Sequence, residues 1–107
     1  MTTATLDRVA VDLRERGHKV VEAGGVRNGI GFSPEALRAL ESIIENGIIS
    51  MIDHNETDPP HLTMAQDNLA RFVDELAREA KAQSDPVIEE HHVMALQAKF
   101  CPVFPFK

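Results

Sequence analysis

The strongest constraint in this sequence is an apolar repeat of helical period between Ser33 and Asp53. Ser33 is a good helix cap, Pro34 suits the first helical position, and the repeat keeps its phase through Gly47. The spacing predicts one long helix over residues 33–53, with an apolar arc covering about half of its circumference. Such an arc is broader than one neighbouring helix usually covers. Its members are Leu37, Leu40, Ile43, Ile44, Ile48, Met51 and Ile52.

The segment before this helix is predicted to mix helix and strand. Apolar residues at helical spacing indicate a first helix over Thr5–Arg16, and Gly17 is a natural residue to end it. Residues 19–22 then favour a short strand, followed by a glycine-rich connector over residues 23–32.

Within the connector, Asn28-Gly29 favours a tight turn with a positive φ. We therefore expect a small hairpin between Val20-Val21 and Ile30–Phe32. No second convincing strand follows, so a parallel sheet is not expected.

Two more helices are predicted towards the C-terminus. Residues 54–62 indicate a loop stiffened by two prolines, and Thr63 with Gln66 forms a capping-box pattern that opens an amphipathic helix. Asp85-Pro86 is expected to begin the last helix. That helix is apolar on opposite faces, which is typical of a helix packed between two layers. One face carries Val87, Met94 and Ala98, and the other carries Val93, Leu96 and Phe100.

Together these patterns predict a mainly α fold, a small helical domain of about four helices with a short β element or hairpin between the first two. We expect one domain over residues 1–107. It comprises a helix with the glycine-rich connector (1–32), a helical core (33–100) and an apolar extended tail (101–107).

Charge and cysteine content restrict the partners. The net charge is -6, and residues 1–32 carry +1 while the remainder carries -7. Such a surface repels polyanions, so neither nucleic acid nor an anionic membrane is an expected partner. Cys101 is the sole cysteine, which prohibits an intrachain disulfide. No secretory signal or membrane span is recognisable, so we expect a soluble cytoplasmic protein.

A metal site is one hypothesis for function. His54 and His61 bracket an acidic loop, and Glu89 with His92 forms an E-x-x-H pair on a helix. Imidazole and carboxylate suit zinc or iron, and a dimer could supply a second copy of the pair. His91 shares a face with apolar residues, so it is interpreted as a partly buried core histidine. No cofactor is otherwise expected.

Other chemical motifs are weak. The connector glycines precede a helix N-terminus, but Pro34 occupies the third glycine position of the dinucleotide fingerprint. Cys101-Pro102 is interpreted as an apolar filler rather than a haem-responsive or reactive site. No nucleophile signature is visible, so catalysis is not expected.

Association through an apolar surface is the favoured hypothesis. Three of the five phenylalanines lie in the last eight residues. With the broad arc of residues 37–52, they exceed what one small core needs. We therefore expect a homodimer acting in protein–protein interaction, as a regulatory or structural protein, with an acidic surface that suits a basic protein partner. The expected interface residues are Leu37, Leu40, Ile44, Ile48, Met51, Phe100, Val103, Phe104 and Phe106.

Overall fold

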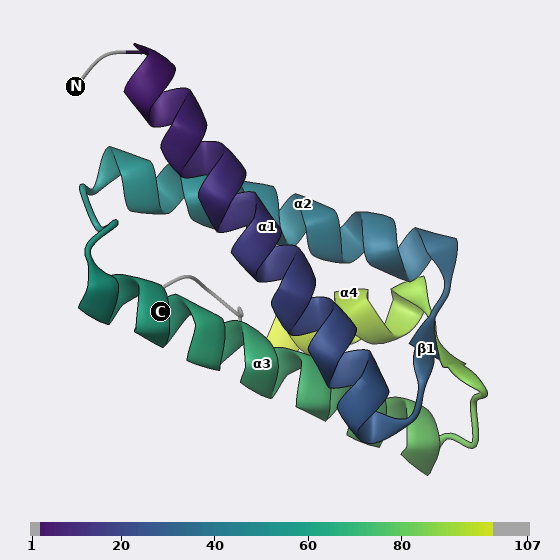
Figure 1. Cartoon of the computed structure of the whole chain (residues 1–107). Coiled ribbons are helices and arrows are strands. Elements are labelled where there is room, and N and C mark those ends of the chain that lie inside the picture. Colours follow the sequence, from purple (N-terminus) through teal and green to yellow (C-terminus); the bar gives the residue numbers. More distant parts are fainter. Residues whose placement is uncertain (1–2, 100–107) are drawn as a thin grey trace.

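The computed structural model describes residues 3–99, with side chains from residue 7 onwards. Over this range the chain forms four helices and two short strands (Figure 1). Their order is α1 (Thr3–Asn28), β1 (Gly31–Phe32), α2 (Pro34–Asp53), α3 (Pro59–Ala82), β2 (Val87–Ile88) and α4 (Glu90–Lys99). The predicted fold class, mainly α with a β element between the first two helices, is confirmed.

Helix α1 is longer than predicted, because Gly17 does not end it. Residues 19–22, predicted as a strand, continue the same helix. Gly17 is buried in mid-helix, where an added Cβ would lie 3.0 Å from Ile44 of α2. Gly24 is likewise buried against Val73 of α3. Close packing of α1 on two helices therefore outweighs the low helix propensity of glycine, which costs about 1 kcal/mol per residue.

Asn28-Gly29 ends α1 rather than turning a hairpin. Gly29 has the predicted positive φ, at 67°. The Gly29 N–H donates to the Val26 carbonyl at 3.2 Å, and the Ile30 N–H donates to the Gly25 carbonyl at 3.1 Å. These two bonds form a Schellman motif, which commonly ends helices with glycine in the left-handed conformation.

The β element pairs differently from the prediction. β1 lies beside β2 in a parallel two-stranded ladder, with Gly31 opposite Val87 and Phe32 opposite Ile88. The expected hairpin is therefore wrong, as is the expectation of no parallel pairing. Residues 20–21 remain in α1, and the partner strand comes from the segment that joins α3 to α4 (Figure 1).

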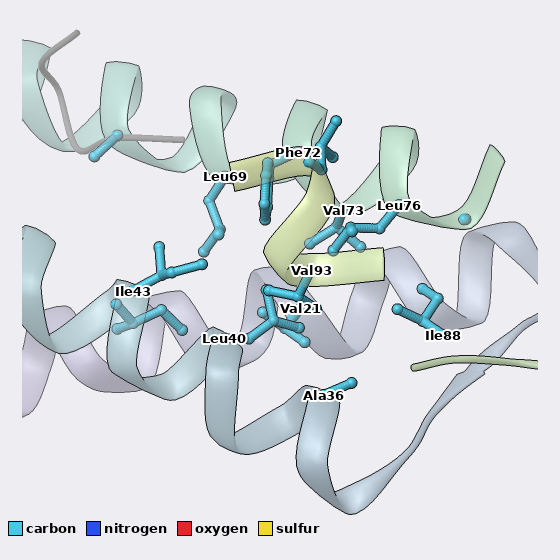
Figure 2. Close-up of a cluster of buried hydrophobic side chains, with 14 of the residues drawn as sticks. Val21, Ala36, Leu40, Ile43, Leu69, Phe72, Val73, Leu76, Ile88 and Val93 are labelled. Carbon is cyan, nitrogen blue, oxygen red and sulfur yellow. The ribbon is translucent and has the colours of Figure 1, made fainter. Parts of the chain in front are cut away.

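The long helix over residues 33–53 is confirmed as α2. The Ser33 side chain caps it by accepting a hydrogen bond from the Ala36 N–H at 3.1 Å. α1 crosses in front of α2 and α3, and α4 lies behind them (Figure 1). The broad apolar arc of α2 thus faces neighbours on two sides within one chain. Figure 2 shows Leu40 in the same buried cluster as residues of the other three helices, including Val21, Phe72 and Val93.

The starts of the last two helices differ from prediction. α3 begins at Pro59 rather than Thr63, because Pro59-Pro60 occupy its first turn instead of stiffening a loop. α4 begins at Glu90 rather than at Asp85-Pro86, since residues 87–88 pair with β1.

The two-sided burial predicted for the last helix is present on one side only. Val93 and Leu96 are buried, whereas Met94 and Ala98 are exposed in the single chain. Phe100 lies outside the described residues.

No helix among the described residues is both long enough and apolar enough to cross a lipid bilayer.

Candidate functional site

An apolar groove of about 430 Å³ lies between α1 and α2, and we name it the α1–α2 groove. Its apolar lining comes from α1, β1 and α2. Phe32 contributes from β1, which lies in the connection between the two helices. The apolar lining residues are Val21, Phe32, Leu37, Leu40 and Ile44. Leu40 and Ile44 are almost fully buried, whereas Leu37 is 40% exposed at the rim. The groove therefore offers an apolar surface beside an accessible leucine.

The polar lining of the groove is mainly acidic. It consists of His18 and Glu22 on α1 and Glu41 on α2, all exposed. Within the described part of the chain, neither Glu22 nor Glu41 takes part in an ion pair. Two carboxylates thus remain available to a cationic group of a bound molecule.

An ion pair joins the two helices one turn from His18. Arg14 of α1 donates to both carboxylate oxygens of Glu45 on α2, with 3.0 Å between Nη2 and Oε1. The hydrogen bond from Arg14 lowers the pKa of Glu45 from its ordinary value of 4.5, although partial burial opposes this. The same pair raises the pKa of Arg14. The bridge ties the helices together at the end of the groove.

This bridge gives a pH-dependent contribution to stability. A carboxyl group with a lowered pKa in the folded state stabilises the protein above its ordinary pKa, here 4.5, and loses that contribution as the pH falls through the lowered value. Glu45→Gln should therefore lower the melting temperature by a few degrees at neutral pH and by less at about pH 3. Thermal melts by circular dichroism at both pH values measure this. The exposed Glu15, which has no ion pair among the described residues, gives the matched control Glu15→Gln. Equal shifts for both variants would contradict the assignment.

The predicted interface residues fall into three groups. Leu40, Ile44, Ile48 and Met51 are at most 2% exposed and belong to the core of the single chain. Leu37 is exposed on the rim of the α1–α2 groove. The predicted residues of the tail (Phe100, Val103, Phe104 and Phe106) lie outside the described residues. Contact of this set with a second chain stays a prediction.

A second cluster of polar side chains lies at the start of α4. One ligand atom each from Asp85, His91 and His92 lies within 4.8 Å of the others. His92 Nε2 is 2.8 Å from Asp85 Oδ2, and His91 Nε2 is 4.0 Å from the same oxygen. His92 is buried, at 3% exposure. These three side chains are a candidate His/Asp site.

The hydrogen bonds of His92 fix its protonation pattern. Its Nδ1 accepts the backbone N–H of Glu89 at 2.9 Å. Because a neutral imidazole carries one N–H, the proton is on Nε2. Nε2 therefore donates to Asp85 and, at 3.2 Å, to Gln83 Oε1.

This pattern serves helix capping. Glu89 immediately precedes α4, and His92 lies three residues later. In a capping box the third helical side chain accepts the backbone N–H of the capping residue. His92 Nδ1 takes the place of the usual Glu or Gln oxygen. Nε2 hydrogen-bonds to Gln83 and Asp85, in the segment that follows α3.

The structure does not bring the four predicted metal-binding residues together. His54 and His61 lie at the α2–α3 connection, at the opposite end of the helices from Glu89 and His92 (Figure 1). His54 Nδ1 lies 2.8 Å from the Ser50 carbonyl oxygen, and His61 contacts Asp58. That contact lowers the pKa of Asp58. Glu89 meets His92 through its backbone, so the i, i+3 spacing here belongs to a cap.

The interpretation of His91 as a core histidine is wrong. Its side chain is 65% exposed, and the buried histidine is His92. Sequence reasoning also missed Asp85 and Gln83 as partners of His92, because the Asp85-Pro86 pair was interpreted as the start of the last helix. Once residues 85–89 form a connection, Asp85 can reach back to the imidazole.

Comparisons with protein-family models, with curated proteins and with solved structures found no match for this chain.

Proposed function

We propose that this chain is a non-catalytic protein-interaction module that self-associates through the α1–α2 groove. The observation that carries the proposal is the combination at this groove of an apolar floor, the exposed Leu37 and two carboxylates without a partner in the described chain. Most of the apolar arc of α2 is covered by α1 and α4. Its most exposed member is Leu37, which lies at the rim of the α1–α2 groove. A groove of this kind suits an apolar segment better than a polar substrate.

The role of the polar groups also supports an interaction function. The two buried polar side chains in the described range are Ser33 and His92, and each caps a helix. Their hydrogen-bonding atoms are thereby used in holding the fold. No reaction is needed to account for their burial.

The alternative, a metal-binding protein or metal-dependent enzyme, has less support. A metal ion at His92 Nε2 would need the lone pair of that nitrogen, which moves the ring proton to Nδ1. The Nδ1–H would then face the Glu89 N–H, two donors at 2.9 Å. Binding at this cluster would therefore require the start of α4 to rearrange.

Sedimentation of the full chain tests the proposal. Leu37→Ser should weaken self-association at least about tenfold, because it removes apolar surface from the groove rim. Ile49→Ser is the matched control, since Ile49 is also exposed on α2, at 57%, but lies outside the groove. It should associate like the unchanged chain, and both variants should keep their helical circular dichroism.

Two results would contradict self-association through the groove. One is a chain that sediments as a monomer at high concentration. The other is weakened association in the Ile49 variant but not in the Leu37 variant, which would place the contact on another face of α2.

A further inference from the structure

We infer that the occupant of the α1–α2 groove is the segment over residues 100–107 of a second copy, each chain inserting its segment into the groove of its partner. The inference rests on the proposed function and names the partner of the same site.

The segment has the chemistry that the groove would take. It reads Phe-Cys-Pro-Val-Phe-Pro-Phe-Lys, with four apolar side chains besides its cysteine and prolines. Proline removes the backbone N–H and fixes φ, so two prolines in eight residues disfavour helix and favour an extended chain. Extended proline-rich segments commonly bind in apolar grooves lined by aromatic side chains, and Phe32 supplies such a ring here.

The charges of the segment and the groove are complementary. The segment contains Lys107 and no acidic residue, so it carries +1 while the rest of the chain carries -7. The groove presents Glu22 and Glu41, which have no ion-pair partner among the described residues. An apolar segment that carries a lysine thus meets an apolar groove with free carboxylates at its rim.

The position of Lys99 favours a groove on another copy. Lys99 ends α4 and its Nζ lies 3.5 Å from Glu79 Oε1 on α3. α4 lies on the side of α2 and α3 opposite to α1 (Figure 1). To reach its own groove, the segment would pass around α2, roughly 16 Å for half the circumference of a helix. At about 3.3 Å per residue this takes up about five residues, so Phe100, Val103 and Phe104 would lie along the path rather than in the groove.

Reciprocal exchange closes the assembly as a dimer. In a two-fold arrangement each chain gives one segment and receives one, so both grooves are filled and no site remains for a third chain. The assembly then contains two equivalent segment–groove contacts, which allows a complementation test.

The test combines two damaged full chains. The groove variant is Leu37→Ser, and the segment variant carries Phe104→Ser and Phe106→Ser. Each variant alone has two damaged contacts and should dimerise at least about tenfold more weakly than the unchanged chain. In the mixture, the heterodimer keeps one intact contact, between the segment of the groove variant and the groove of the segment variant. It should therefore form at least about threefold more tightly than either homodimer.

Four other outcomes would each overturn the inference, and each has a different consequence for the proposed function. If the segment variant dimerises like the unchanged chain while the groove variant does not, the groove has another occupant and the proposed function stands. If both variants are weakened and the mixture shows no recovery, the segment acts outside the groove. If the segment variant melts at a lower temperature at dilutions where the unchanged chain is monomeric, the segment covers its own chain. If the unchanged chain never self-associates, the proposed function falls as well.

Discussion

His92→Ala is expected to lower the free energy of unfolding by about 2–4 kcal/mol, the largest single effect among the polar side chains described. The substitution leaves the Glu89 N–H without its acceptor and takes a donor from Asp85 and Gln83. It also opens a cavity where a side chain only 1% exposed had packed. Chemical denaturation followed by circular dichroism gives the difference, with the unchanged chain as reference.

Two further variants separate the hydrogen bonds of His92 from its bulk. His92→Asn keeps an acceptor near the position of Nδ1, so it should retain part of the stability by still capping α4. His91→Ala is the neighbouring control: its ring lies 4.1 Å from that of His92 between centroids, but it is 65% exposed and caps no helix. Its removal should therefore change stability by about 1 kcal/mol or less. Equal losses for His91→Ala and His92→Ala would contradict the capping role.

Adding zinc tests whether the cluster of Asp85, His91 and His92 binds a metal ion instead of only capping α4. Because both nitrogens of His92 are engaged in hydrogen bonds that a metal ion would disrupt, added zinc should leave the melting temperature of the unchanged chain where it is. A zinc-dependent rise in melting temperature that disappears in His91→Ala and in His92→Asn would instead show that Asp85, His91 and His92 bind metal.

The sequence predicts α2 well because several local signals agree there. The cap at Ser33, the proline after it and the apolar period all specify the same helix, and the structure follows them. α1 fails for the opposite reason. Gly17 and Gly24 are poor helix formers, and only their close approach to Ile44 and Val73 explains why they lie inside a helix. Packing between distant segments is not visible in a local pattern.

Helix ends show the same division. A positive φ follows a helix at three residues, Gly29, Asn55 and Ser84. Glycine and asparagine favour this conformation, whereas serine rarely adopts it, so Ser84 is the hardest of the three to predict. Asp85 donates its N–H to the Ala80 carbonyl at 2.9 Å, which continues that turn beyond α3. The sequence could therefore suggest the turn at Asn28-Gly29 but not the one at Ser84. The displaced start of α4 and the missed contact of Asp85 with His92 both follow from this.

The candidate site was predictable in part. Leu37, Leu40 and Ile44 were identified from the arc of α2, and all three line the α1–α2 groove. Val21, Glu22 and Phe32 were not, because the first segment was divided between a helix and a strand. To predict a groove between two helices, both helices must be identified. Only α2 had a clear local pattern.

Gly24→Ala is expected to destabilise the chain by about 2 kcal/mol, although alanine is the better helix former by about 1 kcal/mol. The added Cβ would lie 2.4 Å from Val73 Cγ1, far inside van der Waals contact. Val73 is fully buried and branched at Cβ, so few rotamers are open to it for avoiding the added methyl group. The helix α1 must therefore shift away from α3, which loosens the crossing that Asn28 and Arg27 hold through Asp74 at 2.8 Å and 2.6 Å.

A double-mutant cycle and a matched glycine decide whether the close approach is the cause. Val73→Ala removes the atoms in the way, so the combined Gly24→Ala and Val73→Ala chain should be more stable than the sum of the two single losses predicts, by about 1–2 kcal/mol. Gly31→Ala is the control, since an added Cβ there meets nothing within 4 Å and should change stability by about 0.5 kcal/mol or less. Additive losses in the cycle would show that the cost at Gly24 does not come from contact with Val73. A stabilised Gly24→Ala chain would show that helix propensity, rather than the packing of α1 on α3, controls this position.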